Sequence, residues 1–291
     1  MMRRLAPWFA CIALIASALQ AHAEPLKVVA TFSILGDLVR NVGGDRVDVT
    51  TLVGPDSDAH VYSPTPADAR KIADARLIVV NGLGFEGWLP RLVQSSGGKA
   101  KVVTASSGIS PLRLGSAADP HAWQSVNNAR IYVANISAAL AAADPVAAGQ
   151  IVKNAEAYLA RLDALDREVR EAVEKLPPAR RKVISTHNAF GYFAAAYGIE
   201  FIAPLGVSTE SEPSARDIAK IITQVKQAKT PAVFLENVTD PRLMQRISAE
   251  TGARVGGTLY SDGLTGEKGD APTYIDMVRH NIRVLTRALG D

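Results

Sequence analysis

Three histidines and one aspartate stand where they could meet at a metal ion. His60, His121 and His187 each lie in a loop beyond a predicted strand, and Asp262 stands in the same relation to a fourth strand. Since open α/β sheets bind ligands at the carboxyl ends of their strands, we expect the four side chains to converge in one cleft. His280 lies in a helical pattern instead, and we predict that it is a surface residue of that helix.

These four side chains would present three nitrogen atoms and one oxygen atom, with one negative charge, to a divalent cation. Zinc accepts such a tetrahedral set, with bonds of about 2.0–2.2 Å. Manganese usually takes more oxygen ligands, whereas copper would bind at least as tightly on affinity alone. A lone histidine is more often structural, and Asp262 before Gly263 could be only a turn residue. The zinc hypothesis therefore depends on the joint placement of the four.

Further residues are candidates to support the site. A metal-bound imidazole usually donates its second N–H to an acceptor, which orients the ring. Asp119 is the strongest candidate because it lies two residues before His121. Trp123 could wall the cleft off from water, or could simply pack in the core. The candidate acids are Asp58, Asp119, Glu210 and Glu236, and the last two fit better as ordinary caps, turn residues or surface acids.

Short β-branched runs alternate with helical stretches, which predicts parallel sheets flanked by helices. A weak internal repeat between residues 52–81 and 205–237 supports two similar lobes, although any two βα units are partly alike. The predicted strands are Leu26–Phe32, Val47–Val53, Leu77–Asn81, Lys101–Thr104, Lys182–Thr186, Glu200–Ala203, Ala232–Leu235 and Arg254–Leu259. The predicted helices are Leu35–Val42, Pro66–Ala73, Phe85–Gln94, Asn188–Tyr197, Ser214–Gln227 and Pro241–Thr251.

One long helix is predicted between the lobes. Apolar residues recur at intervals of three and four over Asp144–Leu176, with Pro145 at the start and two prolines after the end. Some thirty residues at about 1.5 Å each give a rod of roughly 45 Å, long enough to pack against both lobes. We therefore expect a nearly rigid molecule that moves little when a ligand binds. The predicted division is a lobe at 24–143, the helix at 144–177 and a lobe at 178–291.

The N-terminus has the features of a cleavable secretory signal peptide (residues 1–23), so we expect a periplasmic protein. A charged start, an apolar run (Leu5–Leu19) and small residues before Glu24 are typical of such a leader. The alternative is a membrane anchor, but the run is interrupted by Pro7 and is shorter than the ~20 residues that a span needs. Because the leader holds Cys11, the only cysteine, we expect any metal to be held by nitrogen and oxygen atoms.

The composition excludes a disordered or strongly basic protein. The chain has 291 residues, of which 47% are hydrophobic, and its 32 Lys and Arg nearly balance its 29 Asp and Glu. The formal charge of +3 falls to +1 without the leader, since the leader contains two arginines and no acid. No basic face for nucleic acid is implied by this balance. We expect a monomer.

Several motifs together resemble one known family, the TroA- and ZnuA-like solute-binding proteins of zinc and manganese ABC importers. The resemblance covers essentially all of the predicted mature chain, in the same motif order. It implies two four-stranded α/β lobes joined by one long helix, with the metal in the cleft between them. The motifs are Val53–Asp56, His60–Pro66, Asp119–Trp123, Ser185–Phe190, Tyr260–Asp262 and Tyr274–Met277.

By resemblance, His60 and His121 would bind the metal from the first lobe, and His187 and Asp262 from the second. The function implied is capture of Zn²⁺ and its delivery to an inner-membrane ABC permease, without catalysis. Members specialised for manganese often have Glu at the position of His187, so this residue favours zinc, although some His-rich sites in the family accept either ion.

One departure from the zinc members concerns the loop before the second histidine. Many zinc members carry a His- and acid-rich insertion there, whereas Gly115–Ala118 is short and has no histidine. We therefore do not expect this loop to assist metal capture. The AztC-type zinc receptors are the nearest subgroup, and such receptors can work with a periplasmic metallochaperone.

Other functions remain open on the sequence. A secreted zinc-dependent hydrolase would also use three histidines, with an activated water as the fourth ligand. Asp262 decides between the two, since a bound carboxylate closes the shell and a distant one could act as a base. The sequence has neither a His-Glu-x-x-His helix nor a serine nucleophile elbow. A manganese-preferring receptor, or a receptor for an iron chelate with incidental histidines, are further alternatives.

Overall fold

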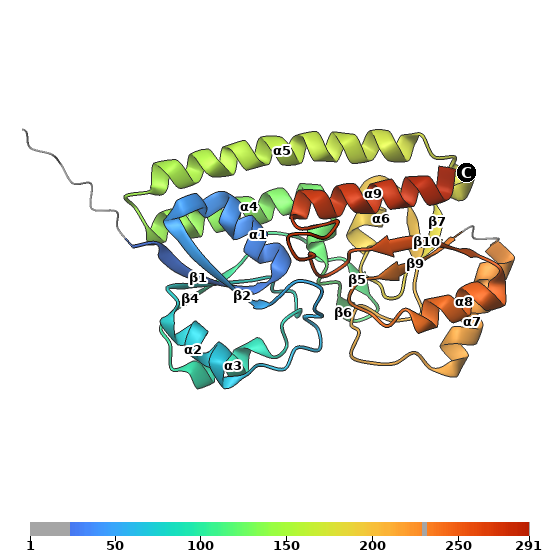
Figure 1. Ribbon diagram of the computed structural model, residues 1–291, viewed down its shortest axis with the longest axis horizontal. Helices are drawn as coiled ribbons and strands as arrows, with labels where there is room; N and C mark the ends of the chain where they lie inside the picture. Colours follow the sequence, from blue (N-terminus) through green and yellow to red (C-terminus); the bar gives the residue numbers. More distant parts are fainter. Residues whose placement is uncertain (1–23, 229–231, 291) are drawn as a thin grey trace, which may run out of the picture.

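Two four-stranded parallel sheets lie side by side along the long axis of the molecule (Figure 1). The computed structural model describes residues 24–228 and 232–290, so the predicted signal peptide and Cys11 lie outside the described residues. The first sheet contains β1 (Leu26–Phe32), β2 (Val47–Val53), β3 (Leu77–Val80) and β4 (Lys101–Thr104). The second contains β7 (Lys182–Ile184), β8 (Glu200–Ile202), β9 (Ala232–Glu236) and β10 (Arg254–Leu259).

The two sheets have the same topology. The first runs β2-β1-β3-β4, and the second, read from its β8 edge, runs β8-β7-β9-β10. In each sheet the first strand therefore pairs with the second and the third, and the fourth strand lies at an edge. This equivalence confirms the predicted two-lobe α/β fold and agrees with the internal repeat in the sequence.

Alternation along the strands explains why helices cover both faces of the first sheet. Val28 and Ala30 of β1 face one apolar cluster, which α1 (Ser33–Gly43) and α4 (Val126–Ala143) complete. Val29 points to the opposite face and packs under α2 (Pro66–Asp74) and α3 (Leu89–Ser96). The buried central strands thus position the loops at their carboxyl ends from both sides.

The second sheet is covered in the same way. Ile184 and Val233 face α7 (Ala215–Ala228) and α8 (Arg242–Thr251). Val183 and Phe234 face α6 (Gly191–Tyr197) and α9 (Tyr274–Gly290). The cluster that contains Val183 continues into the first lobe, so the inner faces of both lobes share one hydrophobic core.

The long helix is α5 (Ala148–Glu174), which crosses the top of both lobes in Figure 1. It packs on α1 and α4 of the first lobe and on α6 and α9 of the second. The predicted start at Asp144 is wrong, because Asp144 ends α4, a helix whose alanine-rich sequence shows little apolar periodicity. Asp144 instead pairs with Arg46 at 2.7 Å, and a short turn precedes α5.

A buried carboxylate links both lobes beneath α5. Asp37 of α1 accepts the backbone N–H of Tyr274, at the start of α9, at 2.9 Å. The hydroxyl of Tyr158 on α5 lies 3.5 Å from the same carboxylate. Burial raises the pKa of Asp37, although its hydrogen bonds act against this shift. Helices from both lobes and the linking helix therefore meet at one residue.

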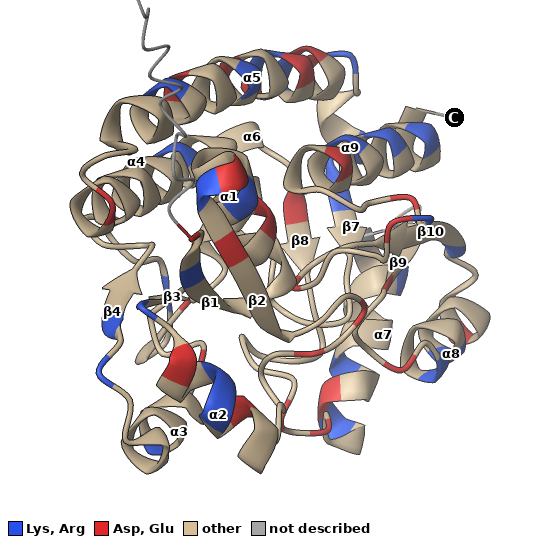
Figure 2. Cartoon of the chain, turned by 60° about the vertical axis from the view of Figure 1, so that its left-hand side comes forward, with Lys and Arg blue, Asp and Glu red and all other residues tan. Residues whose placement is uncertain are grey.

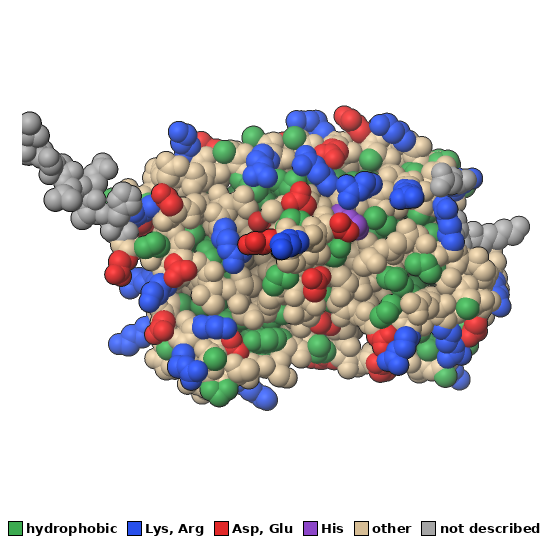
Figure 3. All heavy atoms as spheres, viewed as in Figure 1, with side chains coloured by type: hydrophobic (Ala, Val, Ile, Leu, Met, Phe, Trp, Pro, Cys, Tyr) green, Lys and Arg blue, Asp and Glu red, His purple; other side chains and the backbone are tan. Residues whose placement is uncertain are grey.

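Charged residues are distributed over helices, strands and loops (Figure 2). On the face seen in Figure 3, acidic and basic side chains are interspersed rather than separated into regions of one sign. A short hairpin of β5 (Arg113–Leu114) and β6 (Ala117–Ala118) leads into the segment with His121. Within the described part of the chain, no helix has both the length and the apolar character that a membrane span requires.

Candidate metal centre

His60 lies in the loop after β2, and its backbone is held more firmly than its ring. Its N–H donates to Asp58 Oδ1 at 2.8 Å, and Asp58 Oδ2 accepts the hydroxyl of Thr209 from the other lobe at 2.5 Å. The ring packs edge-on against Phe85, with the centroids 4.7 Å apart. Asp58 therefore orients the loop and not the imidazole.

His121 is fixed by the acid two residues before it. Asp119 Oδ1 lies 2.7 Å from His121 Nδ1 and also accepts the backbone N–H of His121 at 3.0 Å. Since Nδ1–H donates to this carboxylate, the lone pair of Nε2 is free to bind a metal. Trp123 is fully buried against the His121 ring, and its indole N–H donates to the carbonyl of Ser261 at 2.9 Å.

His187 lies three residues after the end of β7 and contacts a carboxylate at the end of β9. Glu236 Oε2 lies 2.6 Å from His187 Nδ1, and Oε1 accepts the backbone N–H groups of Thr186 and His187 at 2.7 and 3.1 Å. Glu236 is thus the counterpart of Asp119 in the second lobe. Glu210 is exposed and contacts none of the four candidate ligands.

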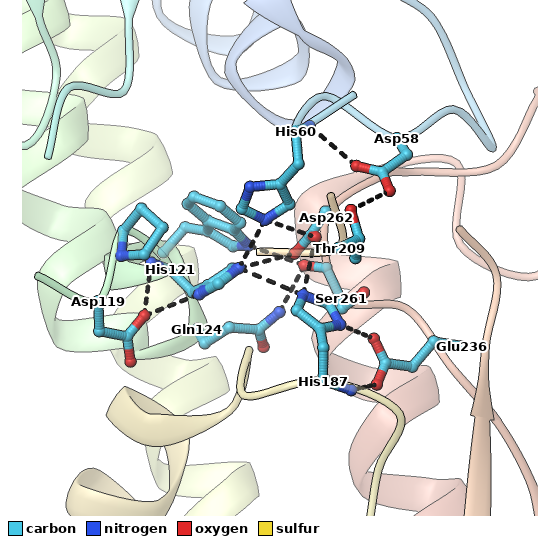
Figure 4. A network of polar contacts seen from close by, with 12 residues as sticks. Asp58, His60, Asp119, His121, Gln124, His187, Thr209, Glu236, Ser261 and Asp262 are labelled. Carbon is cyan, nitrogen blue, oxygen red and sulfur yellow. Dashed lines mark hydrogen bonds and ion pairs between the residues drawn. The ribbon is translucent and has the colours of Figure 1, made fainter. Parts of the chain in front are cut away.

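The four candidate ligands point at one another across the cleft (Figure 4). His121 Nε2 lies 3.2 Å from His60 Nε2 and 3.3 Å from His187 Nε2. The nearest oxygen of Asp262 lies 3.5, 3.5 and 3.1 Å from Nε2 of His60, His121 and His187. A tetrahedron with bonds of about 2.0–2.1 Å has edges of about 3.3 Å. The two histidine pairs that include His121 are therefore spaced like edges of such a tetrahedron, and both oxygens of Asp262 face the same group of nitrogens.

The charges of the cluster also fit a bound cation. Asp262 is completely buried; its oxygens face three imidazole nitrogens and have no hydrogen-bond partner among the described residues. Burial raises the pKa of Asp262, but His187 and His121 outweigh this and hold it well below its usual range. Burial lowers the pKa of His187, yet Glu236 and Asp262 raise it well above its ordinary value. For His121, burial prevails and the pKa is lowered.

The prediction that His280 is a surface residue is wrong. Its side chain is buried between α9 and β10, where Nε2 lies 3.0 Å from the carbonyl oxygen of Thr258. The ring also packs on Tyr260, with the centroids 4.7 Å apart. The apolar face of α9 is wide enough to include this position, so the ring is covered by β10 without joining the metal cluster.

Sequence reasoning missed the loop of residues 81–88, which lies against both histidines of the first lobe. The predicted helix from Phe85 begins only at Leu89, because the preceding residues form a turn. Gly82, Leu83 and Gly84 have φ angles of 80°, 56° and 85°, which no helix accommodates. The glycines at 82, 84 and 87 were the available signal, since such spacing is typical of a loop.

Comparisons with known proteins agree with this geometry. Residues 28–288 match the family model described as zinc-uptake complex component A, periplasmic. The iron-binding protein YfeA of Yersinia pestis is 35% identical over 272 residues, covering 92% of this chain and 88% of YfeA. The manganese-binding lipoprotein MntA of Halalkalibacterium halodurans is 36% identical over 269 residues, covering 92% and 89%.

Solved structures show the same fold. The periplasmic zinc-binding protein TroA of Treponema pallidum superposes with a TM-score of 0.87 at 32% identity, covering 91% of this chain and 99% of TroA. A manganese-bound periplasmic metal-binding protein from Candidatus Liberibacter asiaticus gives a TM-score of 0.83, with the same identity and coverage. A cadmium-bound structure of the latter protein also matches.

Proposed function

The chain belongs to the family of zinc-uptake complex component A proteins, which are metal-binding receptors of ABC transporters and not enzymes, and on this premise we propose that it captures Zn²⁺ for import. The observation that carries the proposal is the buried cluster of His60, His121, His187 and Asp262, whose potential ligand atoms all lie within 4.8 Å of one another. In the proposed complex, the three Nε2 atoms and the Asp262 carboxylate bind the ion.

The donor set favours zinc over the other ions for which relatives are named. Three imidazoles and one carboxylate suit a four-coordinate ion, whereas manganese generally takes more oxygen ligands. The carboxylates of Asp119 and Glu236 keep two rings with Nε2 facing the ion. Mn²⁺ is the alternative cargo, because MntA is named for manganese.

The position of Asp262 argues against a zinc hydrolase. Hydrolysis needs an open coordination position where a water can be activated. One or the other oxygen of Asp262 lies 3.1–3.5 Å from each of the three Nε2 atoms, which supports the proposal that this carboxylate takes the fourth coordination position and does not stand back as a base. A shell closed in this way is suited to holding an ion rather than to catalysis.

The remaining parts of the proposal concern location and partners. We propose that the chain is exported to the periplasm, that its leader is cleaved after residue 23 and that the mature protein is a monomer. This monomer would deliver its ion to an inner-membrane ABC permease and would bind no nucleic acid. A periplasmic metallochaperone is the further partner that the AztC-like features of the sequence suggest. The lobes would extend over 24–143 and 178–291, with 144–177 as the connection.

Equilibrium dialysis with elemental analysis tests the cargo. The chain from residue 24 is dialysed against equimolar Zn²⁺, Mn²⁺ and Fe²⁺, and we expect about one zinc per chain. His187→Ala should lose the ion, while His280→Ala should retain it, since His280 is buried outside the cluster. Preferential retention of manganese would refute the zinc assignment. Equal uptake by the wild type and His187→Ala would refute the site.

A further inference from the structure

The loop between β3 and α3, residues 81–88, contributes no candidate ligand, yet it contacts the segments that carry both histidines of the first lobe. On one side, Trp88 Nε1–H donates to the carbonyl oxygen of Ala59 at 2.8 Å. Ala59 is the residue immediately before His60. The neighbouring Phe85 packs against the His60 ring, so the loop contacts both the backbone and the ring of this segment.

On the other side, the same loop bonds to the residue immediately before His121. Asn81 Nδ2–H donates to the carbonyl oxygen of Pro120 at 2.9 Å. The amide oxygen of Asn81 accepts the hydroxyl of Tyr132, a fully buried residue of α4. The loop therefore ties together two ligand-bearing segments that are far apart in the sequence.

Glu86 holds the loop in the shape that makes both contacts. Its Oε1 accepts the N–H of Asn81 at 2.6 Å and the hydroxyl of Thr31 at 2.7 Å, and its Oε2 accepts the N–H of Gly82 at 3.1 Å. The side chain is only 7% exposed. The positive φ angle of Leu83 is unfavourable for a residue with a side chain, so the loop needs such support.

We propose that Glu86 is a positioning residue of the metal site, acting through residues 81–88 to hold His60 and His121 at the spacing of a tetrahedral edge before the ion arrives. The inference rests on the proposed function for the identity of the ion. A neutral amide at position 86 cannot accept all three donors, because its NH₂ group would face at least one of them. Glu86→Gln should therefore loosen both histidine segments.

Zinc affinity is measured by competition with a chromophoric chelator. Glu86→Gln should weaken binding about tenfold or more, in the range typical of residues that orient metal ligands. Trp88→Phe removes the N–H bonded to Ala59, together with part of the ring that packs on Tyr62, and should weaken binding too. The double variant should lose less than the product of the single losses, because both changes act through one loop. An affinity of Glu86→Gln within twofold of the wild type would overturn the inference.

Two further variants separate positioning from stability. Asp144→Asn removes the ion pair with Arg46, in a turn distant from the cleft, and should lower the urea midpoint without changing zinc affinity. Thr31→Val removes one donor to Glu86 and is the milder test where Glu86→Gln does not fold. It should weaken binding in the same direction by a smaller factor, and unchanged affinity with an altered urea midpoint would count against the inference.

Nitrogen NMR of the histidine rings in the metal-free chain gives a readout that does not depend on the ion. Glu86→Gln should shift the ring signals of His60 and His121 and leave those of His280 unchanged. Should the wild type bind manganese in place of zinc while these shifts occur, the proposed function fails and the inference stands. Should the wild type bind zinc while Glu86→Gln changes neither affinity nor ring signals, the inference fails and the proposed function stands.

Discussion

Replacement of Glu236 by Gln changes one atom of the contact that orients His187. In the wild type, Oε2 faces Nδ1 at 2.6 Å while Oε1 accepts two backbone N–H groups. In the variant, the amide oxygen can keep the backbone bonds only if the NH₂ group faces Nδ1. The ring would then accept at Nδ1 and carry its proton on Nε2, the atom that must bind the ion.

The expected loss is about 10- to 100-fold in zinc affinity, or about 1.4–2.7 kcal/mol. The opposite orientation of the amide is also unfavourable, because its NH₂ group would then face the two backbone N–H donors and could accept neither hydrogen bond. Loss of a negative charge close to a dication adds to the effect. Because Glu236 raises the pKa of His187, the variant also holds the competing proton less tightly, so its loss should be smaller at pH 6 than at pH 8.

The assay is competition with a chelator of known affinity at both pH values and constant ionic strength. Glu210→Gln is the matched control, since it makes the same chemical change at an exposed acid that contacts none of the four candidate ligands, and it should bind like the wild type. A folded Glu236→Gln protein with zinc affinity within twofold of the wild type at pH 8 would refute the reasoning. A loss that grows toward pH 6 would refute the argument from proton competition at His187 in particular.

Three further outcomes are expected. Zinc affinity of the wild type should fall as the pH is lowered from 7.5 to 5.5, because the raised pKa of His187 makes protons compete with the ion. The fall should be up to about tenfold per pH unit for each proton displaced, and an affinity that is flat over this range would contradict the prediction. Zinc at a thousandfold excess over Kd should stabilise the fold by about 4 kcal/mol, or roughly 10 °C in a thermal melt against a chelator-treated sample; superimposable melts would argue against a specific site. Leu162→Ala, in the fully buried face of α5, should cost about 2–5 kcal/mol in urea unfolding, and a cost below about 1 kcal/mol would show that α5 is loosely packed.

The sequence predicts most of the sheets because burial on both faces leaves a clear signature. Strands such as Leu26–Phe32 and Val47–Val53 are short runs rich in β-branched residues, and their predicted bounds agree with the structure. The helix α4 was missed because its alanines make it nearly uniform around its axis. Asp144 looked like a helix start for the same reason, since the helix that it ends was not recognised.

The site is predictable as far as chain neighbours determine it. Asp119 was the strongest candidate acid because it precedes His121 by two residues, and the structure places it on the ring. Glu236 could not be distinguished from Glu210 in this way, because its contact with His187 depends on the pairing of β7 and β9. Glu86 gave no signal either, since its acceptor role exists only once the loop has taken its left-handed shape.

The meeting of α1, α5 and α9 at Asp37 has a mechanical consequence. A single rod between two bodies resists bending but still allows each body to twist about the axis of the rod. Here α9 starts against Asp37 of the first lobe and packs along β10 of the second lobe. It therefore forms a second connection between the lobes beside α5 (Figure 1). Two helices side by side resist torsion, and we therefore expect release of a bound ion to come from deformation of the ligand-bearing loops rather than from rotation of the lobes.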